Sequence, residues 1–413
     1  MRKIRDRVAG LDVHRDSVVA CTRIAVADGE VDTAKRRFPA TQRGLADLAG
    51  FLTDAGVTTV AMEATGVYWK PVFYVLEDLF AEVWLCNAQH VKNVPGRKTD
   101  MSDAEWLADV VAHGMIRPSF VPPPEIRELR DLTRYRKTLV DERTREIQRL
   151  EKVLQDAGVK LTSVASGVWG ASTRHMIEAL IAGERDAEVL AGMALTRMQA
   201  KVERLAEVMP ARFNAHHGFM CKQVISHIDF LDRTIAELSG QIAEHVAPFE
   251  PAVRVITSMP GIATLTAHVI IAEIGTDMSR WPTAGHLCAW AGLAPASHES
   301  AGKHKPAGTR HGARWLRRTL IEAALAASRT QNSYYQALYK RIARRRGHNK
   351  AIVAVAHSML ATIWHLLSTG TTTYQDPGGD YFDRLQDPAR EVKRLARRIQ
   401  ALGYTITITP PAA

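Results

Sequence analysis

Three consecutive prolines, Pro122 to Pro124, divide this chain into two parts with different sequence patterns. Proline has no backbone N–H and disfavours helical geometry in the residue before it, so neither a helix nor a central strand passes through this point. Residues 8–115 alternate between short apolar runs and amphipathic stretches, whereas helical periodicity dominates after the prolines. We therefore expect an α/β domain over residues 1–116 and a mostly α-helical remainder.

The first part has the element order of a mixed sheet covered by helices. Strand-like runs come at 8–13, 17–27 and 30–38, and then helical and strand-like segments alternate: helical at 41–56, 66–79 and 102–114, strand-like at 57–64 and 82–87. Three early strands followed by this alternation are typical of a sheet with helices on its faces.

The remainder is expected to hold a helical linker or coiled-coil region (117–250), a mostly helical domain (251–370) and a basic tail (371–413). Residues 126–158 and 222–246 carry apolar residues at steps of three or four, a stripe that fits a core, a coiled-coil arm or a dimer contact equally well. In the tail, 387–403 indicates an amphipathic basic helix and 404–410 a short strand.

The longest apolar run, residues 351–367, contains His357, Ser358, Thr362 and His365. A membrane span needs about 20 apolar residues without such groups, so we expect a buried helix and no membrane partner. No secretory signal is visible at the N-terminus. The four cysteines are far apart and form no CxxC pair, which fits a reducing cytoplasm and neither a disulfide framework nor a zinc site.

Positive charge is concentrated late in the chain. Residues 303–350 hold thirteen Lys and Arg residues and one acid, Glu322, a net charge of +12 against +10 for the whole chain. Solvated helix faces usually interleave acids with bases, so this excess favours a polyphosphate partner such as nucleic acid.

Four acids in the first part stand where a metal site could form. Asp12 and Glu63 come near the ends of two apolar strands, where an unpaired charge is costly, and Asp100 and Asp103 lie three apart at a helix start. Carboxylates from several elements are the ligands that paired Mg²⁺ ions need. For the last two acids, helix capping is the simpler explanation: Asp100 as N-cap, Asp103 in the first turn, or a capping box of Ser102 and Glu105.

These motifs resemble a known family. GLDVH with Asp12, MEATGVYW with Glu63 and KTDMSDA with Asp100 and Asp103 look like the DEDD transposases of the insertion-sequence family numbered 110, whose first domain is similar to the RuvC resolvase and ribonuclease H fold. SMPGIATLTAHVIIAEIG, WAGLAPASHESAGK and GTRHGARWLRRTLIEAA resemble that family's second domain, in the same order. The resemblance covers nearly the whole chain.

The resemblance also bears on the segment 297–312. On chemistry alone, a serine in this basic, glycine-rich loop is a phosphate hydrogen-bond donor, and the spacing of His298, His304 and His311 does not favour zinc. The family carries a nucleophilic serine here, and the alignment implies Ser300, with Ser297 as the rival. An alkoxide attacking phosphorus would link protein and DNA covalently.

Other residues are expected to contact nucleic acid. Pro260 and Gly261, in a turn before a helix, look like a helix-hairpin-helix element, although a proline-started core helix is an equally good interpretation. The basic residues expected to bind phosphates are Lys303, Lys305, Arg310, Arg314, Arg317, Arg318, Arg344, Arg345 and Arg346.

The predicted function is that of a recombinase that cuts and rejoins donor and target DNA with one or two Mg²⁺ ions bound by the four acids. The resemblance further implies a noncoding bridge RNA that pairs with both DNAs, a homo-oligomer (dimer or tetramer) and a cytoplasmic, nucleoid-associated protein. Two alternatives stay open: a metal-dependent junction-resolving nuclease that uses water, and a nucleic-acid-binding protein without chemistry.

Overall fold

In a computed structural model the chain forms two compact units, Met1–Val121 and Pro122–Ala413. The expected division into four parts stays a prediction. The structure describes residues 4–26, 30–64, 66–96, 101–209, 212–296, 299–300, 302–304, 308–309, 311–385 and 388–407.

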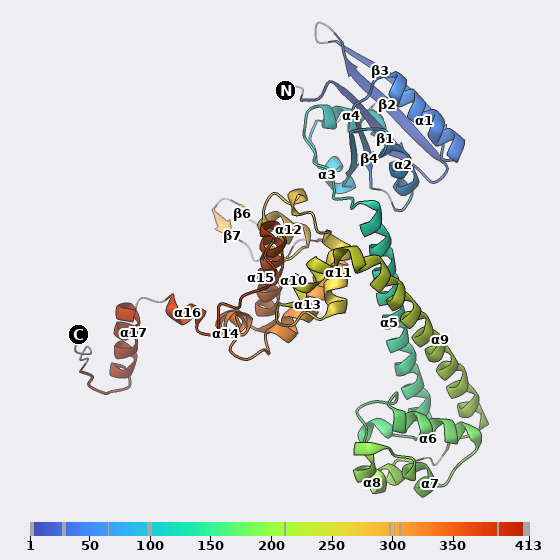
Figure 1. Ribbon diagram of the computed structural model, residues 1–413, viewed down its shortest axis with the longest axis vertical. Helices are drawn as coiled ribbons and strands as arrows, with labels where there is room; N and C mark the ends of the chain where they lie inside the picture. The colour runs from blue at the N-terminus through green and yellow to red at the C-terminus, as the bar shows by residue number, and fades with distance from the viewer. Residues whose placement is uncertain are drawn as a thin grey trace. The chain divides into compact units, whose positions relative to one another are not determined.

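A five-stranded mixed sheet forms the centre of the first unit (Figure 1), with the strand order β3-β2-β1-β4-β5. β1, β2 and β3 are antiparallel, whereas β4 and β5 run parallel to β1, so the predicted mixed sheet is confirmed. The strands are β1 (Arg7–Val13), β2 (Ser17–Ala25), β3 (Val31–Pro39), β4 (Thr59–Glu63) and β5 (Glu82–Cys86).

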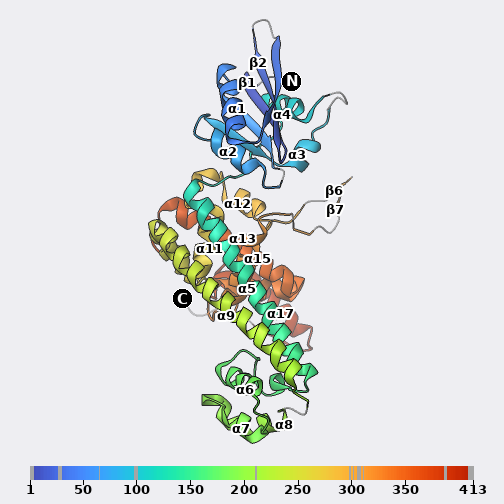
Figure 2. The same cartoon turned by 90° about the vertical axis from the view of Figure 1, so that its right-hand side faces the viewer.

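Helices cover both faces of this sheet. α1 (Gln42–Asp54) and α2 (Trp69–Leu76) pack on one face, and α4 (Asp103–Ala112) packs on the other; both views show this arrangement (Figures 1 and 2). A short helix that the sequence pattern did not reveal, α3 (Ala88–Lys92), follows β5. Strand residues alternate between the two layers, with Ala9 and Leu11 in the core under α1 and α2 and Val8 in the core under α4.

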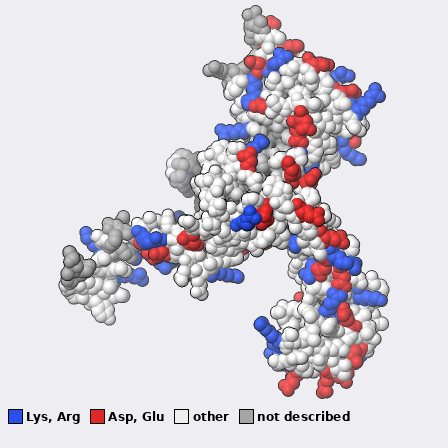
Figure 3. Space-filling view, viewed as in Figure 1, with Lys and Arg blue, Asp and Glu red and all other residues white. Residues whose placement is uncertain are grey.

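Two long helices lie side by side in the second unit, α5 (Pro124–Asp156) and α9 (Ala215–Val246). Both predicted helices are confirmed, and their apolar stripes meet within one chain. Ion pairs join them as well, including that of Arg143 with Asp232. Figure 3 shows acidic and basic side chains interleaved along this helical pair, the pattern of a solvated surface.

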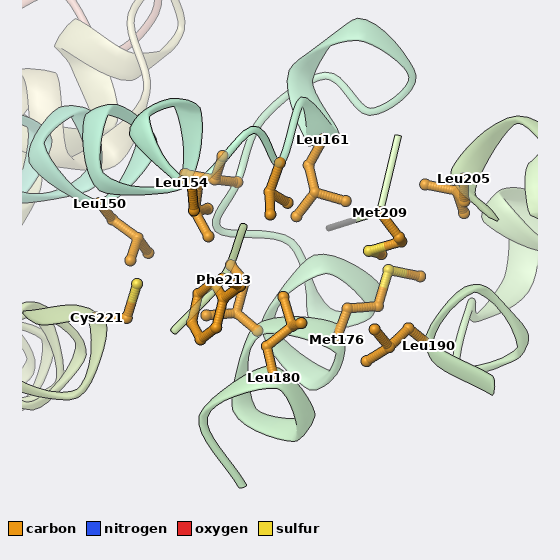
Figure 4. Packing of buried hydrophobic residues seen from close by; sticks show 14 of the residues in the cluster. Leu150, Leu154, Leu161, Met176, Leu180, Leu190, Leu205, Met209, Phe213 and Cys221 are labelled. Atoms are coloured by element: carbon orange, nitrogen blue, oxygen red, sulfur yellow. The ribbon is translucent and has the colours of Figure 1, made fainter. Parts of the chain in front are cut away.

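A small helical module joins the far ends of α5 and α9. It contains η2 (Leu161–Ser163), α6 (Ala171–Ala182), α7 (Ala187–Gly192), η3 (Thr196–Lys201) and α8 (Val202–Glu207). Leu154, Leu180 and Phe213 are among the side chains that meet in its core (Figure 4). Arg174 on α6 makes two hydrogen bonds to the Asp229 carboxylate on α9, at 2.6 and 2.8 Å, and so fixes the module to the long helix.

The C-terminal helices pack around α15 (His348–Thr369), whose neighbours include α10, α12, α13 and α14. α15 is long and apolar enough to cross a membrane by composition, but one face of it, which includes Val355 and Leu360, is buried inside the protein. The prediction of a buried core helix is confirmed. The other helices are η4 (Ala247–Phe249), α10 (Glu250–Thr257), α11 (Thr264–Ile274), η5 (Met278–Arg280), α12 (Ala284–Trp290), α13 (Arg314–Ala327) and α14 (Tyr334–Arg346).

Aromatic contacts hold the segment after α15 against α14. Tyr374 stacks on Tyr335, and Phe382 of α16 (Tyr381–Arg384) stacks on Tyr334. The predicted basic helix follows as α17 (Pro388–Gln400). The short strand predicted at 404–410 is wrong for residues 404–407, which form no strand, because a strand needs a partner for its backbone groups and no described segment pairs with these residues. Residues 408–410 lie outside the described part of the chain.

Candidate functional site

Asp12 and Glu63 lie at matching positions on two neighbouring parallel strands. The ladder between β1 and β4 pairs Leu11 with Met62, and Asp12 and Glu63 are the next residue on each strand. Neighbouring strands are about 4.8 Å apart, so the two backbones carry their carboxylates side by side. Both are at the carboxyl ends of strands, where α/β sheets collect ligands.

The two acids share the sheet face that α4 covers. Side chains alternate along a strand, and Ala9, Leu11 and Val13 all belong to the core on the opposite face, which leaves Asp12 on the α4 face. Met62 likewise belongs to the opposite core, so Glu63 projects toward α4. Asp12 is half-buried, and its Oδ2 lies 3.2 Å from Nε2 of His14.

α4 begins directly above β1. Ser102 is its N-cap, its hydroxyl accepting a hydrogen bond from the Glu105 N–H at 3.4 Å, and Asp103 is the first helical residue. Gly10 allows the close approach, because an added Cβ would lie 2.1 Å from the Ala104 carbonyl oxygen. Ala104, the residue after Asp103, therefore lies against Gly10, which is two strand positions before Asp12.

The capping interpretation is thus confirmed for Ser102, and Asp100 is not the N-cap of α4. Asp100 itself lies outside the described residues. Within the described part of the chain, no three His, Cys, Asp or Glu side chains form a group that could hold a metal ion. The residue types still suit a hard divalent cation, because Asp12, Glu63 and Asp103 carry carboxylate oxygens; that they bind one stays a prediction.

Nearby acids contribute to the raised pKa values of two cysteine thiols in this domain. Burial, with the Glu63 charge adding to it, raises the pKa of the Cys86 thiol to about 12. Burial also raises the pKa of Cys21 on β2 to about 11, with a contribution from Glu105 on α4. Glu105 is a further acid near the sheet, and the sequence analysis considered it only as part of a capping box. Its position two residues after Asp103 could have pointed to this role. All four cysteines are free thiols.

The loop of the second unit is a β-hairpin. β6 (Glu299–Ser300) pairs with β7 (Lys303–His304), which sets Ser300 opposite Lys303, and Gly302 has a φ of +72° in the turn between them. An isolated bridge between Pro295 and Thr309 closes its base. The side chain of Ser300 lies outside the described residues, as do Ser297, His298, Lys305 and Arg310. What the structure gives is a serine backbone held beside an exposed lysine.

The predicted helix-hairpin-helix segment consists of α10, a turn and α11. Gly261 in the turn has a φ of +82°, and an added Cβ would lie 2.5 Å from both the Ala323 carbonyl oxygen and the Ala327 nitrogen of α13. Gly261 is therefore required for packing against α13. Pro260 is half-buried beside it. A phosphate contact from this turn stays a prediction.

The expected phosphate-binding arginines fall into two groups. Arg318 makes two hydrogen bonds to Asp141 on α5, at 2.7 and 3.0 Å, so it is part of the packing between α5 and α13. Arg314, which lies over the Trp315 ring, is exposed, and Arg317 is half-buried. Arg344, Arg345 and Arg346 are exposed in the last turn of α14, and among the described residues no carboxylate lies within ion-pair distance of them. These three cations are available to a partner.

Two family models of known proteins match this chain. A family model described as a transposase, of the DEDD type of IS110, matches residues 9–158, and the model of the IS116/IS110/IS902 transposase family matches residues 253–340. Together they match more than half of the chain. The chain belongs to the IS110 family of insertion-sequence transposases. It is therefore a DNA transposase, and its DEDD domain indicates dependence on a divalent metal.

Relatives of this family member come from several bacteria. An IS110 element protein of Streptomyces coelicolor is 33% identical over 143 residues, which is 33% of this chain and 32% of the relative. An IS116 element protein of Streptomyces clavuligerus is 26% identical over 70% of this chain and 79% of the relative. The transposase for insertion sequence element IS1328 of Yersinia enterocolitica is 25% identical over 70% of this chain and 75% of the relative.

Proposed function

We propose that this transposase cuts and rejoins DNA with a serine nucleophile, Ser300, and a Mg²⁺ site formed by Asp12, Glu63, Asp100 and Asp103. The observation that carries the proposal is the position of Asp12 and Glu63 at matching ends of adjacent parallel strands, under the helix that begins at Asp103. The strand order, three antiparallel strands followed by two parallel ones, supports a RuvC- and ribonuclease H-like domain.

The four acids would hold one or two Mg²⁺ ions. When bound, these ions would stabilise the negative charge that develops on the phosphate oxygens during strand exchange. Carboxylates on separate elements repel one another without such ions, and the cation charge offsets this repulsion. We expect Asp12 and Glu63 to give the fixed part of the site, because both are on strands of the central sheet.

Ser300 would be the attacking group. Its Oγ forms a bond to phosphorus while a bridging P–O bond of the strand breaks, and the proton of Oγ ends on the oxygen that leaves. The phosphoserine link conserves the bond for the rejoining step. Lys303, opposite Ser300 in the hairpin, would stabilise the developing charge, with Arg310 and Arg314 nearby in sequence.

Partners follow from the same proposal. Donor and target DNA would lie along the basic residues of the second unit, including Arg344 to Arg346. A noncoding bridge RNA would choose the sequences by base pairing, which suits a protein whose cations contact phosphates. We expect a dimer or tetramer that acts in the cytoplasm, on the nucleoid.

Variants of the two sites test the proposal. With Mg²⁺, Asp12→Asn and Ser300→Ala should each abolish strand cleavage, and Asp16→Asn, an exposed carboxylate four residues from Asp12, should leave it unchanged. Mg²⁺ should raise the melting temperature of wild type and Ser300→Ala but not that of Asp12→Asn. If Ser300→Ala still cuts DNA, the nucleophile is water and the protein is a metal-dependent nuclease.

A further inference from the structure

A cavity of about 300 Å³ opens in the second unit between α5, α9, α11 and α13. Its apolar wall comes from Val140, Ile242, Leu265, Val269 and the half-buried Trp315. Ligand sites in proteins start at about this size, and they combine an apolar lining with a few polar groups. The cavity is therefore large enough for one small planar group and too small for a longer segment of a polymer.

Four cations line the cavity, and three of them are neutralised within the protein. Arg134 is hydrogen-bonded to Glu273 through two nitrogens, and Lys137 lies 3.6 and 3.7 Å from oxygens of Asp141 and Glu322. Arg318 is held by Asp141 as described above. Each of these three cations is thus paired with at least one acid.

Arg136 is the exception. Its Nε donates to the Ser239 hydroxyl at 2.7 Å, and no described carboxylate lies within 4.0 Å of its guanidinium. Burial lowers the pKa of Arg136 below its ordinary value, yet a guanidinium stays charged in proteins. Its two Nη groups have no acceptor among the described residues, so the cavity has one positive charge that no described carboxylate compensates, on a planar fork of N–H donors.

We propose that this cavity binds one unpaired nucleotide of a single-stranded nucleic acid, with the phosphate on Arg136 and the base against Trp315. A guanidinium fork matches a phosphate, and aromatic rings bind bases of any sequence by stacking. Arg314 lies over the Trp315 ring, with its guanidinium carbon 5.1 Å from the ring centroid, so we expect a base to stack on the opposite face. The proposal rests on the proposed function, because it assumes a nucleic-acid substrate that is partly single-stranded during strand exchange.

The test measures binding of short labelled oligonucleotides to the full-length protein by fluorescence anisotropy. Trp315→Leu should weaken single-strand binding about 5- to 150-fold, the range of one stacked base. Arg136→Gln should also weaken it through the lost phosphate contact, and both variants should leave duplex binding unchanged. Trp315→Phe, which keeps an aromatic ring, should retain most of the affinity that Trp315→Leu loses. Arg254→Gln, an exposed arginine of the same unit, is the matched control and should bind as wild type. Single-stranded DNA and RNA of the same sequence, measured separately, show which strand uses the site.

An abasic nucleotide separates a base-binding site from a structural role. Replacing one base by an abasic site should weaken binding to wild type and have little effect on Trp315→Leu, which has already lost the stacking partner. If Trp315→Leu does not fold, Leu265→Glu at the mouth of the cavity, where the side chain is 39% exposed, should still lower single-strand affinity.

Three results would overturn the proposal. The abasic change could weaken wild type and Trp315→Leu equally, Arg136→Gln could bind single strands normally, or inorganic phosphate could compete as well as a nucleoside monophosphate. If wild type binds neither duplex nor single strands, the proposed function itself fails. If duplex binding persists and only the single-strand predictions fail, the proposed function stands and the cavity has another role.

Discussion

The ion pair that joins α5 to α11 offers a direct test of how the second unit is held together. Glu273 is fully buried, and its carboxylate oxygens accept hydrogen bonds from Nε and Nη2 of Arg134 at 2.7 and 2.8 Å. Arg130, one turn earlier on α5, donates to the carbonyls of Ala272 and Glu273 at 3.0 and 2.6 Å. Two arginines of α5 thus satisfy the end of α11.

Arg134→Met would leave the Glu273 charge buried with a weaker partner. Breaking a buried ion pair by removing one member costs about 3–5 kcal/mol of unfolding free energy. Because Arg130, with Nε 3.8 Å from the Glu273 carboxylate, still partly compensates its charge, we expect a cost near the low end of this range, about 3 kcal/mol. Since 1.4 kcal/mol is about a factor of ten, amide hydrogens of α11 should exchange roughly 100-fold faster. Hydrogen exchange read by mass spectrometry measures this in the full chain.

Two further variants make the test specific. Arg134→Met/Glu273→Leu removes both charges and should cost clearly less than Arg134→Met alone, because no charge is left buried. Arg254→Met removes an exposed pair with Glu250, at 3.7 Å, and should cost less than about 1 kcal/mol. The reasoning is refuted if Arg134→Met leaves the exchange of α11 unchanged, or if the double variant is the least stable of the three.

Three other predictions concern packing and charge. Gly10→Ala should displace α4 and strongly reduce DNA cleavage, since the added Cβ would lie 2.1 Å from the Ala104 oxygen. Gly50→Ala, with open space around it in α1, should stabilise the protein by about 0.5–1 kcal/mol. Cleavage assays and melting curves compare the two variants. Gly261→Ala should cost clearly more than Gly370→Ala in chemical unfolding, because both have positive φ but only Gly261 would clash with α13. Arg174 holds the pKa of Asp229 below its ordinary value, so this pair stabilises the helical module above about pH 4. The contribution is lost as the pH falls through the lowered pKa. Asp229→Asn should therefore be less stable than wild type at pH 7 and should lose less stability than wild type when the pH is lowered.

The fold was predictable where the pattern is local. Short apolar runs in residues 8–13 and 57–64 predicted β1 and β4, and the triple proline predicted a boundary just before α5. The amphipathic stripes of α5 and α9 predicted two helices. They did not predict that these helices pack against each other, because an apolar stripe indicates that one face is buried but not which element covers it. The Arg134–Glu273 pair joins residues 139 apart, a distance over which the sequence carries no visible signal.

The candidate site divides in the same way. Asp12 and Glu63 could be singled out from the sequence, because a charge at the end of a buried strand is costly unless it is paired or bound to a cation. The role of Gly10 was not, since the close approach of α4 to β1 exists only in three dimensions. Arg318 was expected to bind phosphate from its place in a basic cluster, and its bond to Asp141 shows that sequence charge alone does not separate structural cations from available ones.

Mapping the covalent link is the measurement that tests the central claim most directly. Wild-type protein is incubated with Mg²⁺ and its DNA, and the adduct is digested with nuclease and trypsin and sequenced by mass spectrometry. The peptide from Trp281 to Lys303 contains both Ser297 and Ser300, and we predict a nucleotide on Ser300. A nucleotide on Ser297, or strand cleavage without any protein–DNA adduct, would contradict the account.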